Sequence, residues 1–166
     1  LIWFLFNSLA YSQYAINGDA YQLSDQCFRL TPDKFSQSGS VWSLNKVNIK
    51  QDFEISLTMY FGNKDHGADG MAFVLQKTSN AAGTQGVGIG YQGIDTSFAV
   101  EFDTYKNGGE ITDDHCAVQK DGVLNHGGPY NLFPDFSISD GDIEDDTEYN
   151  VVFKYTHGDS TFIVLF

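Results

Sequence analysis

Two carboxylates stand close together in the stretch FAVEFDTYKNGGEITDDHCAV, which spans residues 98–118. Glu101 and Asp103 are two residues apart, so in a β-strand they would share one face roughly 7 Å apart. A cation between them would convert their repulsion into shared coordination. Carboxylate, amide and backbone carbonyl oxygens suit Ca²⁺, whereas Glu, Asp and His together suit a transition ion such as Mn²⁺. The alternative is an acidic strand face in contact with solvent.

The alternation of residues around these carboxylates predicts how the strand is oriented. Its apolar face, expected to meet the core, carries Phe98, Val100 and Phe102. Its other face carries Ala99, Glu101, Asp103, Tyr105 and Asn107. The segment GGEITDD then predicts a turn that brings His115 back beside the carboxylates, with Cys116 and Val118 on the core side.

A second acidic position, Asp69, lies in HGADGMAFVL at the mouth of a strongly apolar segment. The alternative for this pattern is a plain turn, since Asp-Gly is a frequent turn pair. The glycine-rich GTQGVGIGY at residues 83–91 does not predict a phosphate-binding loop, because neither a strand-to-helix context nor a Walker lysine accompanies it.

The composition indicates one folded domain. The chain has 166 residues, of which 42% are hydrophobic and 15% aromatic, enough to bury a sizeable core. Its formal net charge of −13 argues against nucleic acid or an anionic membrane as partner, because both require a basic face. The charge is compatible with cation binding and equally with an acidic surface.

The first stretch, LIWFLFNSLAYSQ, is apolar, uncharged and too short to span a bilayer as a helix. It resembles the hydrophobic region of a secretory signal peptide, with small residues at possible cleavage sites. We therefore predict a signal-peptide remnant at residues 1–13, a domain at residues 14–166, and a secreted location, extracellular or at the cell surface. The alternative is a buried first strand. No other segment predicts membrane insertion.

The two cysteines, Cys27 and Cys116, are compatible with one disulfide and equally with two buried thiols. We favour a small buried side chain at Cys116, since it lies on the expected strand that follows His115. No Cys/His spacing typical of zinc sites is present.

Short segments separated by glycine turns predict an all-β fold. FEISLTMYFG alternates between apolar and polar residues, MAFVLQ predicts a strand buried on both faces, and VWSLNKVNI (41–49) predicts another strand. YNVVFKY and TFIVLF predict a hairpin. Many strands without helices predict an antiparallel β-sandwich or jelly roll. We expect it to be truncated at its C-terminus, because Phe166 stands inside an apolar strand.

Several motifs resemble those of the legume-type (L-type) lectin family, especially its secreted bacterial members, and they follow one another in the family's order. This family is part of the concanavalin A-like lectin and glucanase superfamily. The matching pieces are CFRLTPD, GSVW, GADGMAFVLQ, GVGIGYQGI and AVEFDTYKN…DH. They span roughly residues 18–166, and EFDTYxN with an upstream ADG is specific in combination. The resemblance implies a concanavalin A-like sandwich with a Ca²⁺ site, often paired with a transition-metal site.

The resemblance also implies a role for each metal ligand. Glu101 would bind the transition metal only, and Asp103 would bridge both ions. Tyr105, through its backbone carbonyl, and Asn107, through its side-chain oxygen, would complete the Ca²⁺ shell. His115 would bind the transition metal.

A further carboxylate should bridge the two ions, and three candidates stay open. Glu110 keeps the family's five-residue separation from His115, but the family has Asp there and places it closer to five residues after Asn107. Asp113 and Asp114 compete for the role. This difference from the family's bridging carboxylate affects the transition-metal site more than the Ca²⁺ site, because Ca²⁺ accepts a flexible set of ligands that includes water.

Asp69 resembles the family's sugar-binding aspartate, which follows a cis peptide bond held through the metal site, so that sugar binding depends on metal. The ionised carboxylate would accept hydrogen bonds from two sugar hydroxyls, and Asn107 would donate its NH₂. Tyr105 would offer its ring, and a backbone N–H near Gly86 or Val87 would add a donor. Such shallow sites bind weakly and gain avidity from multivalency. We predict glycans as partners of an adhesion or glycan-recognition module in a larger secreted protein.

Two other functions are alternatives. A glycoside hydrolase of this superfamily would carry ExDxE or ExDxxE, but Tyr105 and Lys106 stand where its second glutamate belongs, so we predict no enzyme. A structural adhesion module would lack sugar binding, against which the intact set of Asp69, Tyr105 and Asn107 argues. The acidic SDGDIEDD at residues 139–146 predicts a solvated turn and not an EF-hand. The other histidines, His66, His126 and His157, are interpreted as loop residues.

Overall fold

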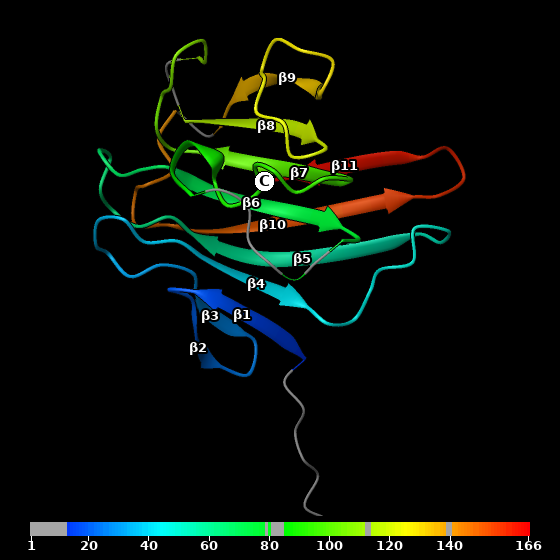
Figure 1. Ribbon diagram of the computed structural model, residues 1–166, viewed down its shortest axis with the longest axis horizontal. Coiled ribbons are helices and arrows are strands. Elements are labelled where there is room, and N and C mark those ends of the chain that lie inside the picture. Colours follow the sequence, from blue (N-terminus) through cyan, green and yellow to red (C-terminus); the bar gives the residue numbers. More distant parts are fainter. Residues whose placement is uncertain (1–12, 79, 81–84, 112–113, 139–140) are drawn as a thin grey trace, which may run out of the picture.

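The computed structural model describes residues 13–78, 80, 85–111, 114–138 and 141–166, and these form a nearly all-β molecule (Figure 1). The predicted signal peptide, apart from Gln13, and the candidate ligand Asp113 lie outside the described residues. Within them, the helical structure is a short 3-10 helix, η1 (Gly86–Gly88). No helix in this part of the chain is long and apolar enough to cross a membrane.

Two larger antiparallel sheets carry the architecture. The four-stranded sheet has the order β6 (Gly70–Gln76), β7 (Ser97–Asp103), β8 (His115–Lys120) and β9 (Asn131–Ser137). The three-stranded sheet has the order β11 (Thr161–Leu165), β10 (Glu148–Thr156) and β5 (Phe53–Tyr60). β10 and β11 form the predicted hairpin, and β5 carries the predicted alternation, with Ile55 and Met59 turned to the core.

Two smaller antiparallel pairs lie at the lower end of Figure 1. β1 (Tyr14–Gly18) pairs with β4 (Gly39–Ser43), and β2 (Tyr21–Ser24) pairs with β3 (Cys27–Arg29). The strand predicted over residues 41–49 is therefore wrong beyond Ser43. The Ser43 hydroxyl donates to the Asn45 carbonyl and accepts from the Asn45 N–H, and this local turn ends the strand.

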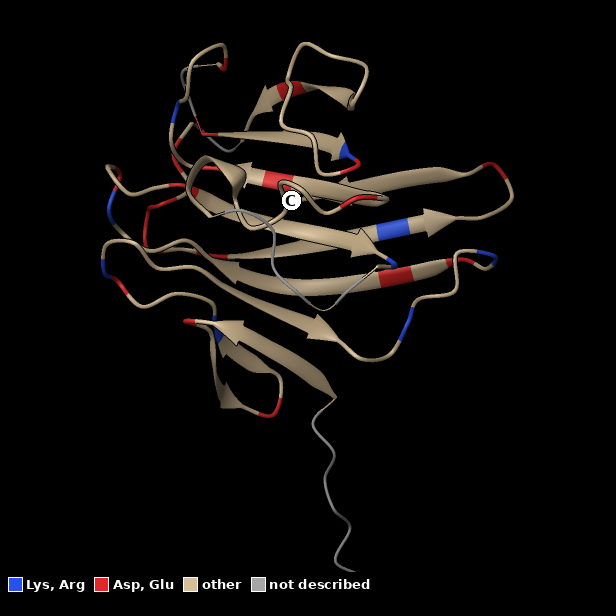
Figure 2. Cartoon of the chain, in the orientation of Figure 1, with Lys and Arg blue, Asp and Glu red and all other residues tan. Residues whose placement is uncertain are grey.

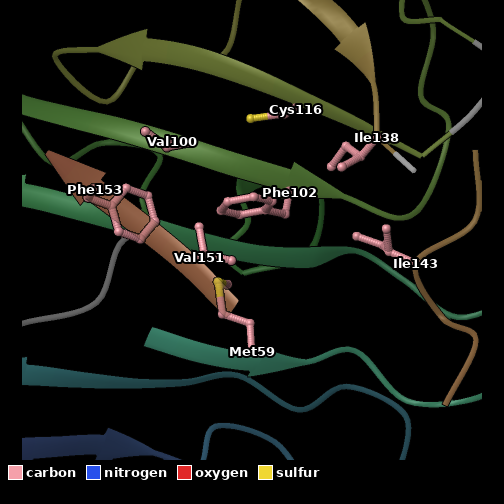
Figure 3. Close-up of a cluster of buried hydrophobic side chains, with 8 residues drawn as sticks. All are labelled: Met59, Val100, Phe102, Cys116, Ile138, Ile143, Val151 and Phe153. Carbon is pink, nitrogen blue, oxygen red and sulfur yellow. The ribbon is translucent and has the colours of Figure 1, made fainter. Parts of the chain in front are cut away.

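The core lies between the two larger sheets, which confirms the predicted antiparallel sandwich. The ring of Phe73 on β6 stacks on Phe153 of β10 with centroids 3.8 Å apart, and Phe98 of β7 meets Phe162 of β11 edge to face. The buried core cluster drawn in Figure 3 consists of Met59, Val100, Phe102, Cys116, Ile138, Ile143, Val151 and Phe153. Val100 and Phe102 thus occupy the core face predicted for them.

A second apolar cluster covers the opposite face of the four-stranded sheet. Ile89 and Tyr91, from the segment after η1, pack on Ala99 of β7 and on Ala72 and Val74 of β6. β6 therefore packs against a different apolar cluster on each face, although its residues are partly buried and not fully buried as the sequence predicted. This cover also removes the polar face of β7 from solvent.

Two interpretations of loop and cysteine residues change. Both cysteines are free, so no disulfide joins Cys27 to Cys116. Cys27 is exposed, whereas Cys116 lies in the core, which confirms the small buried side chain predicted at Cys116. The predicted solvated turn over residues 139–146 is wrong at Ile143 and Glu144, which are 0% and 7% exposed. The backbone N–H of Ile143 donates to the side chain of Asp114, which ties this segment to the chain before β8.

Candidate metal and glycan site

Glu101 is completely buried on β7, between β6 and β8. It is paired with Ala72 and Ala117, whose small side chains leave room for it on both neighbouring strands. The buried hydroxyl of Tyr91 donates a hydrogen bond to Glu101 Oε2. Burial raises the pKa of Glu101 to about 7, although the Tyr91 hydrogen bond favours the ionised form. A carboxylate so enclosed is not the solvated strand face considered as the alternative.

Asp103 ends β7 and is paired with His115, the first residue of β8. This register confirms that the turn brings His115 back beside the carboxylates. Asp103 is 2% exposed, and burial raises its pKa to about 7, with the charges of Glu110 and Glu101 acting in the same direction. The end of β7 therefore gathers acidic groups in a place where water does not stabilise their ionised forms.

The alternation predicted through Asn107 stops at Asp103, because the chain turns there. The backbone N–H of Tyr105 donates to Asp103 Oδ1 at 2.7 Å, which closes a local turn of the kind Asp favours. Asn107 Nδ2 donates to the Tyr105 carbonyl at 3.1 Å, and the Asn107 N–H donates to Glu110 Oε2. Tyr105 and Asn107 thus lie in a loop and not on a strand face, but the loop keeps them beside Asp103.

Three of the predicted metal ligands converge. Asp103, Glu110 and His115 offer ligand atoms that all lie within 4.8 Å of one another. Asp114 instead directs Oδ2 to the backbone N–H of Ile143 at 2.8 Å. Of the two candidates for the bridging carboxylate that the structure describes, the geometry favours Glu110.

His126 is near this group, although the sequence pattern predicted only a loop residue there. Its side chain is 12% exposed, with Nε2 3.3 Å from Glu101 Oε1 and 3.4 Å from Glu110 Oε1. Its Nδ1 lies 2.8 Å from Oδ2 of Asp135 on β9. The ring centroids of His115 and His126 are 5.6 Å apart. A loop residue carries no periodic signal, so only the folded chain places His126 beside the carboxylates.

The donor set fits divalent cations. Glu101 Oε1 and His126 Nε2 are buried and make no hydrogen bond, although buried polar atoms ordinarily have a partner. Figure 2 shows acidic positions within both β7 and β9. Carboxylates with imidazole suit a transition ion, and the carboxylate, carbonyl and amide oxygens from Asp103 to Asn107 suit Ca²⁺.

Asp69 precedes β6, across from the end of β7. The Ala68–Asp69 peptide bond is cis, as the resemblance implies. The Thr104 N–H donates to the Asp69 carbonyl at 3.2 Å, and Asp69 Oδ2 lies 4.0 Å from the position that a Cβ at Gly86 would take. Partial burial raises the pKa of this carboxyl group. Val87 is 51% exposed, so the segment at Gly86 and Val87 stands beside the carboxylate and open to solvent.

The sequence comparison decides the family. Residues 7–166 match the legume lectin beta-barrel domain, of the L-type lectin domain family. The chain belongs to the legume lectin family. Members of this family are carbohydrate-binding domains and not enzymes, and this lectin domain is therefore not an enzyme.

Individual relatives agree with this assignment. The lectin domain is 28% identical over 125 residues to the pesticidal crystal protein Cry22Aa of Bacillus thuringiensis, a match of 74% of this chain but only 16% of that protein. It is similar to the metal-free exoplasmic/lumenal domain of VIP36 (22% identity, TM-score 0.65) and to its Ca²⁺/Man3GlcNAc-bound form (20% identity, TM-score 0.69). Each match covers 92% of this chain and 65% of the VIP36 domain. The chain thus spans less than two thirds of the length of these relatives. At 20–22% identity, the similarity to the VIP36 structures shows the fold alone.

Proposed function

We propose that this lectin domain binds glycans in a metal-dependent manner, as an adhesion or glycan-recognition module of a larger secreted protein. The observation that carries the proposal is the position of Asp69. Its carboxylate lies beside Gly86, and its carbonyl accepts a hydrogen bond from Thr104, the residue after Asp103. Forms of the VIP36 domain with Ca²⁺ and mannose or a mannose oligosaccharide bound support a glycan as partner.

Calcium would be held by Asp103, the Tyr105 carbonyl, the Asn107 side-chain oxygen and Glu110. Hydrogen bonds already gather these groups in one turn, from Tyr105 N–H to Asp103 and from Asn107 N–H to Glu110. When bound, Ca²⁺ supplies positive charge where buried carboxylates repel one another. The residues themselves would hold the loop in the shape that presents Asn107 to a ligand.

A transition ion, Mn²⁺ or another, would be held by Glu101, Asp103, Glu110 and His115. Glu101 and His115 are 0% and 1% exposed, so this position lies behind the glycan surface and not on it. Its role would be structural: it would fix the facing ends of β7 and β8, from which the Ca²⁺ loop starts.

The glycan would be recognised by hydrogen bonds and one aromatic ring. Asp69, ionised, would accept from two adjacent hydroxyls, while Asn107 would donate its NH₂. Tyr105 is 51% exposed and would cover the apolar face of a sugar ring. A backbone N–H at Gly86 or Val87 would add a donor. Because one such site binds weakly, several copies engaging one surface would supply avidity.

The proposed location is outside the cytoplasm, secreted or at the cell surface. The apolar residues 1–13 support export, and the similar VIP36 domain is an exoplasmic/lumenal one. With a net charge of −13, the proposal includes no nucleic-acid partner.

The proposal is tested by comparing the wild type with Asp69→Ala on a glycan array in Ca²⁺-containing buffer. Asp69→Ala should lose array binding while retaining Ca²⁺ affinity by calorimetry, because Asp69 is not among the proposed cation ligands. Asp25→Ala, at an exposed position in the turn between β2 and β3, is the control and should bind as the wild type. Glycan binding retained by Asp69→Ala would contradict the proposed site.

A further inference from the structure

His126 is held in one orientation by a network of its own. Its Nδ1 lies 2.8 Å from Asp135 Oδ2, and Asn131 Nδ2 donates both to Asp135 Oδ1 at 3.0 Å and to the His126 carbonyl at 2.6 Å. When Asp135 accepts the Nδ1 proton of a neutral His126, Nε2 keeps a free lone pair. A carboxylate behind a histidine in this way is the usual companion of a metal-binding imidazole.

Nε2 of His126 is directed at the buried acids. It stands 3.3 Å from Glu101 Oε1 and 3.4 Å from Glu110 Oε1, and neither Nε2 nor Glu101 Oε1 makes a hydrogen bond. Ligand atoms about 2.1 Å from one ion are about 3.0 Å apart at right angles and about 3.4 Å apart in a tetrahedron. The two separations therefore match the edges of a coordination shell. Glu101, His115 and His126 also offer ligand atoms that lie within 4.8 Å of one another.

We propose that His126 is a direct ligand of the transition-metal ion, beside Glu101 and His115, and that Asp135 is its positioning residue. Two imidazoles instead of one make the site favour nitrogen-preferring ions such as Zn²⁺ and Co²⁺ over Mn²⁺. The inference rests on the metal-binding part of the proposed function. It is tested by metal coordination and not by glycan binding, so that the two can fail separately.

The first experiment needs no variant. X-ray absorption spectroscopy of the wild-type protein loaded with one equivalent of Zn²⁺, or of Co²⁺, counts the imidazoles around the ion. Two imidazoles are expected. One imidazole, or a protein that binds neither ion, would overturn the proposal, while Ca²⁺-dependent glycan binding would still support the proposed function.

The second experiment compares metal affinities. Asp135→Asn should weaken Zn²⁺ binding by about 10- to 100-fold, the range found when the partner of a metal-binding histidine is altered. His126→Gln should weaken it more than Asp135→Asn does and should lower Zn²⁺ affinity more than Mn²⁺ affinity. His157→Gln, at an exposed position in the β10–β11 turn, is the matched control and should change neither.

The opposing explanation is that His126 acts as a cation that neutralises the acids without metal. In that case Zn²⁺ affinity in His126→Gln would equal that of His157→Gln, or would rise, and the proposal would be wrong. Circular dichroism in chelator establishes whether each variant folds. If His126→Gln does not fold, the imidazole count in the wild type decides.

Discussion

The backbone N–H of Thr104 donates a hydrogen bond to the carbonyl of Asp69, with N and O 3.2 Å apart. This contact joins the residue proposed to bind sugar to the residue that follows Asp103, a proposed ligand of both ions. We expect a change in the loop that starts at Asp103 to move the backbone of Asp69 through this hydrogen bond. This link would couple the proposed glycan site to the proposed cation sites.

Asp103→Asn should weaken cation binding and glycan binding together. Asn retains an oxygen for the Tyr105 N–H but lacks the charge that both proposed ions share, so Ca²⁺ affinity should fall at least about tenfold. Calorimetry with Ca²⁺ and a glycan array measure the two effects. Asp69→Ala serves as the comparison, since it should lose only glycan binding. Normal Ca²⁺ affinity in Asp103→Asn would remove Asp103 from the proposed site.

Gly70→Ala should destabilise the domain by roughly 3 kcal/mol. Gly70 has φ +127°, and a Cβ there would stand 2.2 Å from the Phe102 carbonyl oxygen, where β6 begins beside β7. Urea unfolding in Ca²⁺-containing buffer gives the free energy of unfolding.

The matched control for Gly70→Ala is Gly158→Ala in the β10–β11 turn, where a Cβ would meet nothing within 4 Å. Its free energy of unfolding should differ from the wild type by less than about 1 kcal/mol. Equal effects of the two substitutions would contradict the close approach at Gly70.

Glu144→Gln should change how stability depends on pH. Burial, reinforced by the charges of Asp114, Asp142 and Asp65, raises the pKa of Glu144 to about 7. Between the ordinary carboxyl pKa and pH 7 the folded protein therefore keeps a proton that the unfolded chain releases, so this group's contribution to stability falls as pH rises through that window. Glutamine carries no charge and escapes the loss.

The measurement is the free energy of unfolding of wild type and Glu144→Gln at several pH values from 4 to 8. The variant should gain roughly 1–3 kcal/mol relative to the wild type as pH rises through the window. Glu148→Gln, at an exposed position, should run parallel to the wild type. A difference between Glu144→Gln and wild type that stays constant with pH would refute the raised pKa.

The parts of the fold that rest on strand periodicity were predictable. Phe98, Val100 and Phe102 alternate with Glu101 and Asp103 along β7. A strand of a sandwich can bury these apolar residues only by turning the face that carries them toward the core. The return of His115 to the carboxylates was also predictable, because strands that are consecutive in the chain and joined by a glycine-containing loop commonly pair antiparallel.

Where side chains form local hydrogen bonds, periodicity failed. Ser43 and Asn45 end β4 early, and the turn closed by Asp103 and Tyr105 takes Asn107 off the strand face. A two-residue alternation contains no information on such turns.

Long-range packing accounts for the other differences. His126 and Glu144 are loop residues in sequence, yet the side chain of His126 is only 12% exposed and Glu144 is buried. No local pattern distinguishes them from solvated loop residues. The burial of Glu101 is equally invisible to local patterns, because Tyr91, which donates a hydrogen bond to it, comes from the segment after η1.

The most direct test of the central claim is glycan binding by the wild-type protein in excess EDTA, followed by return of Ca²⁺. On glycans bound in Ca²⁺-containing buffer, the account predicts that binding disappears in chelator and returns when Ca²⁺ is restored, while Asp69→Ala stays inactive throughout. Glycan binding that persists unchanged in EDTA would contradict the metal-dependent mechanism.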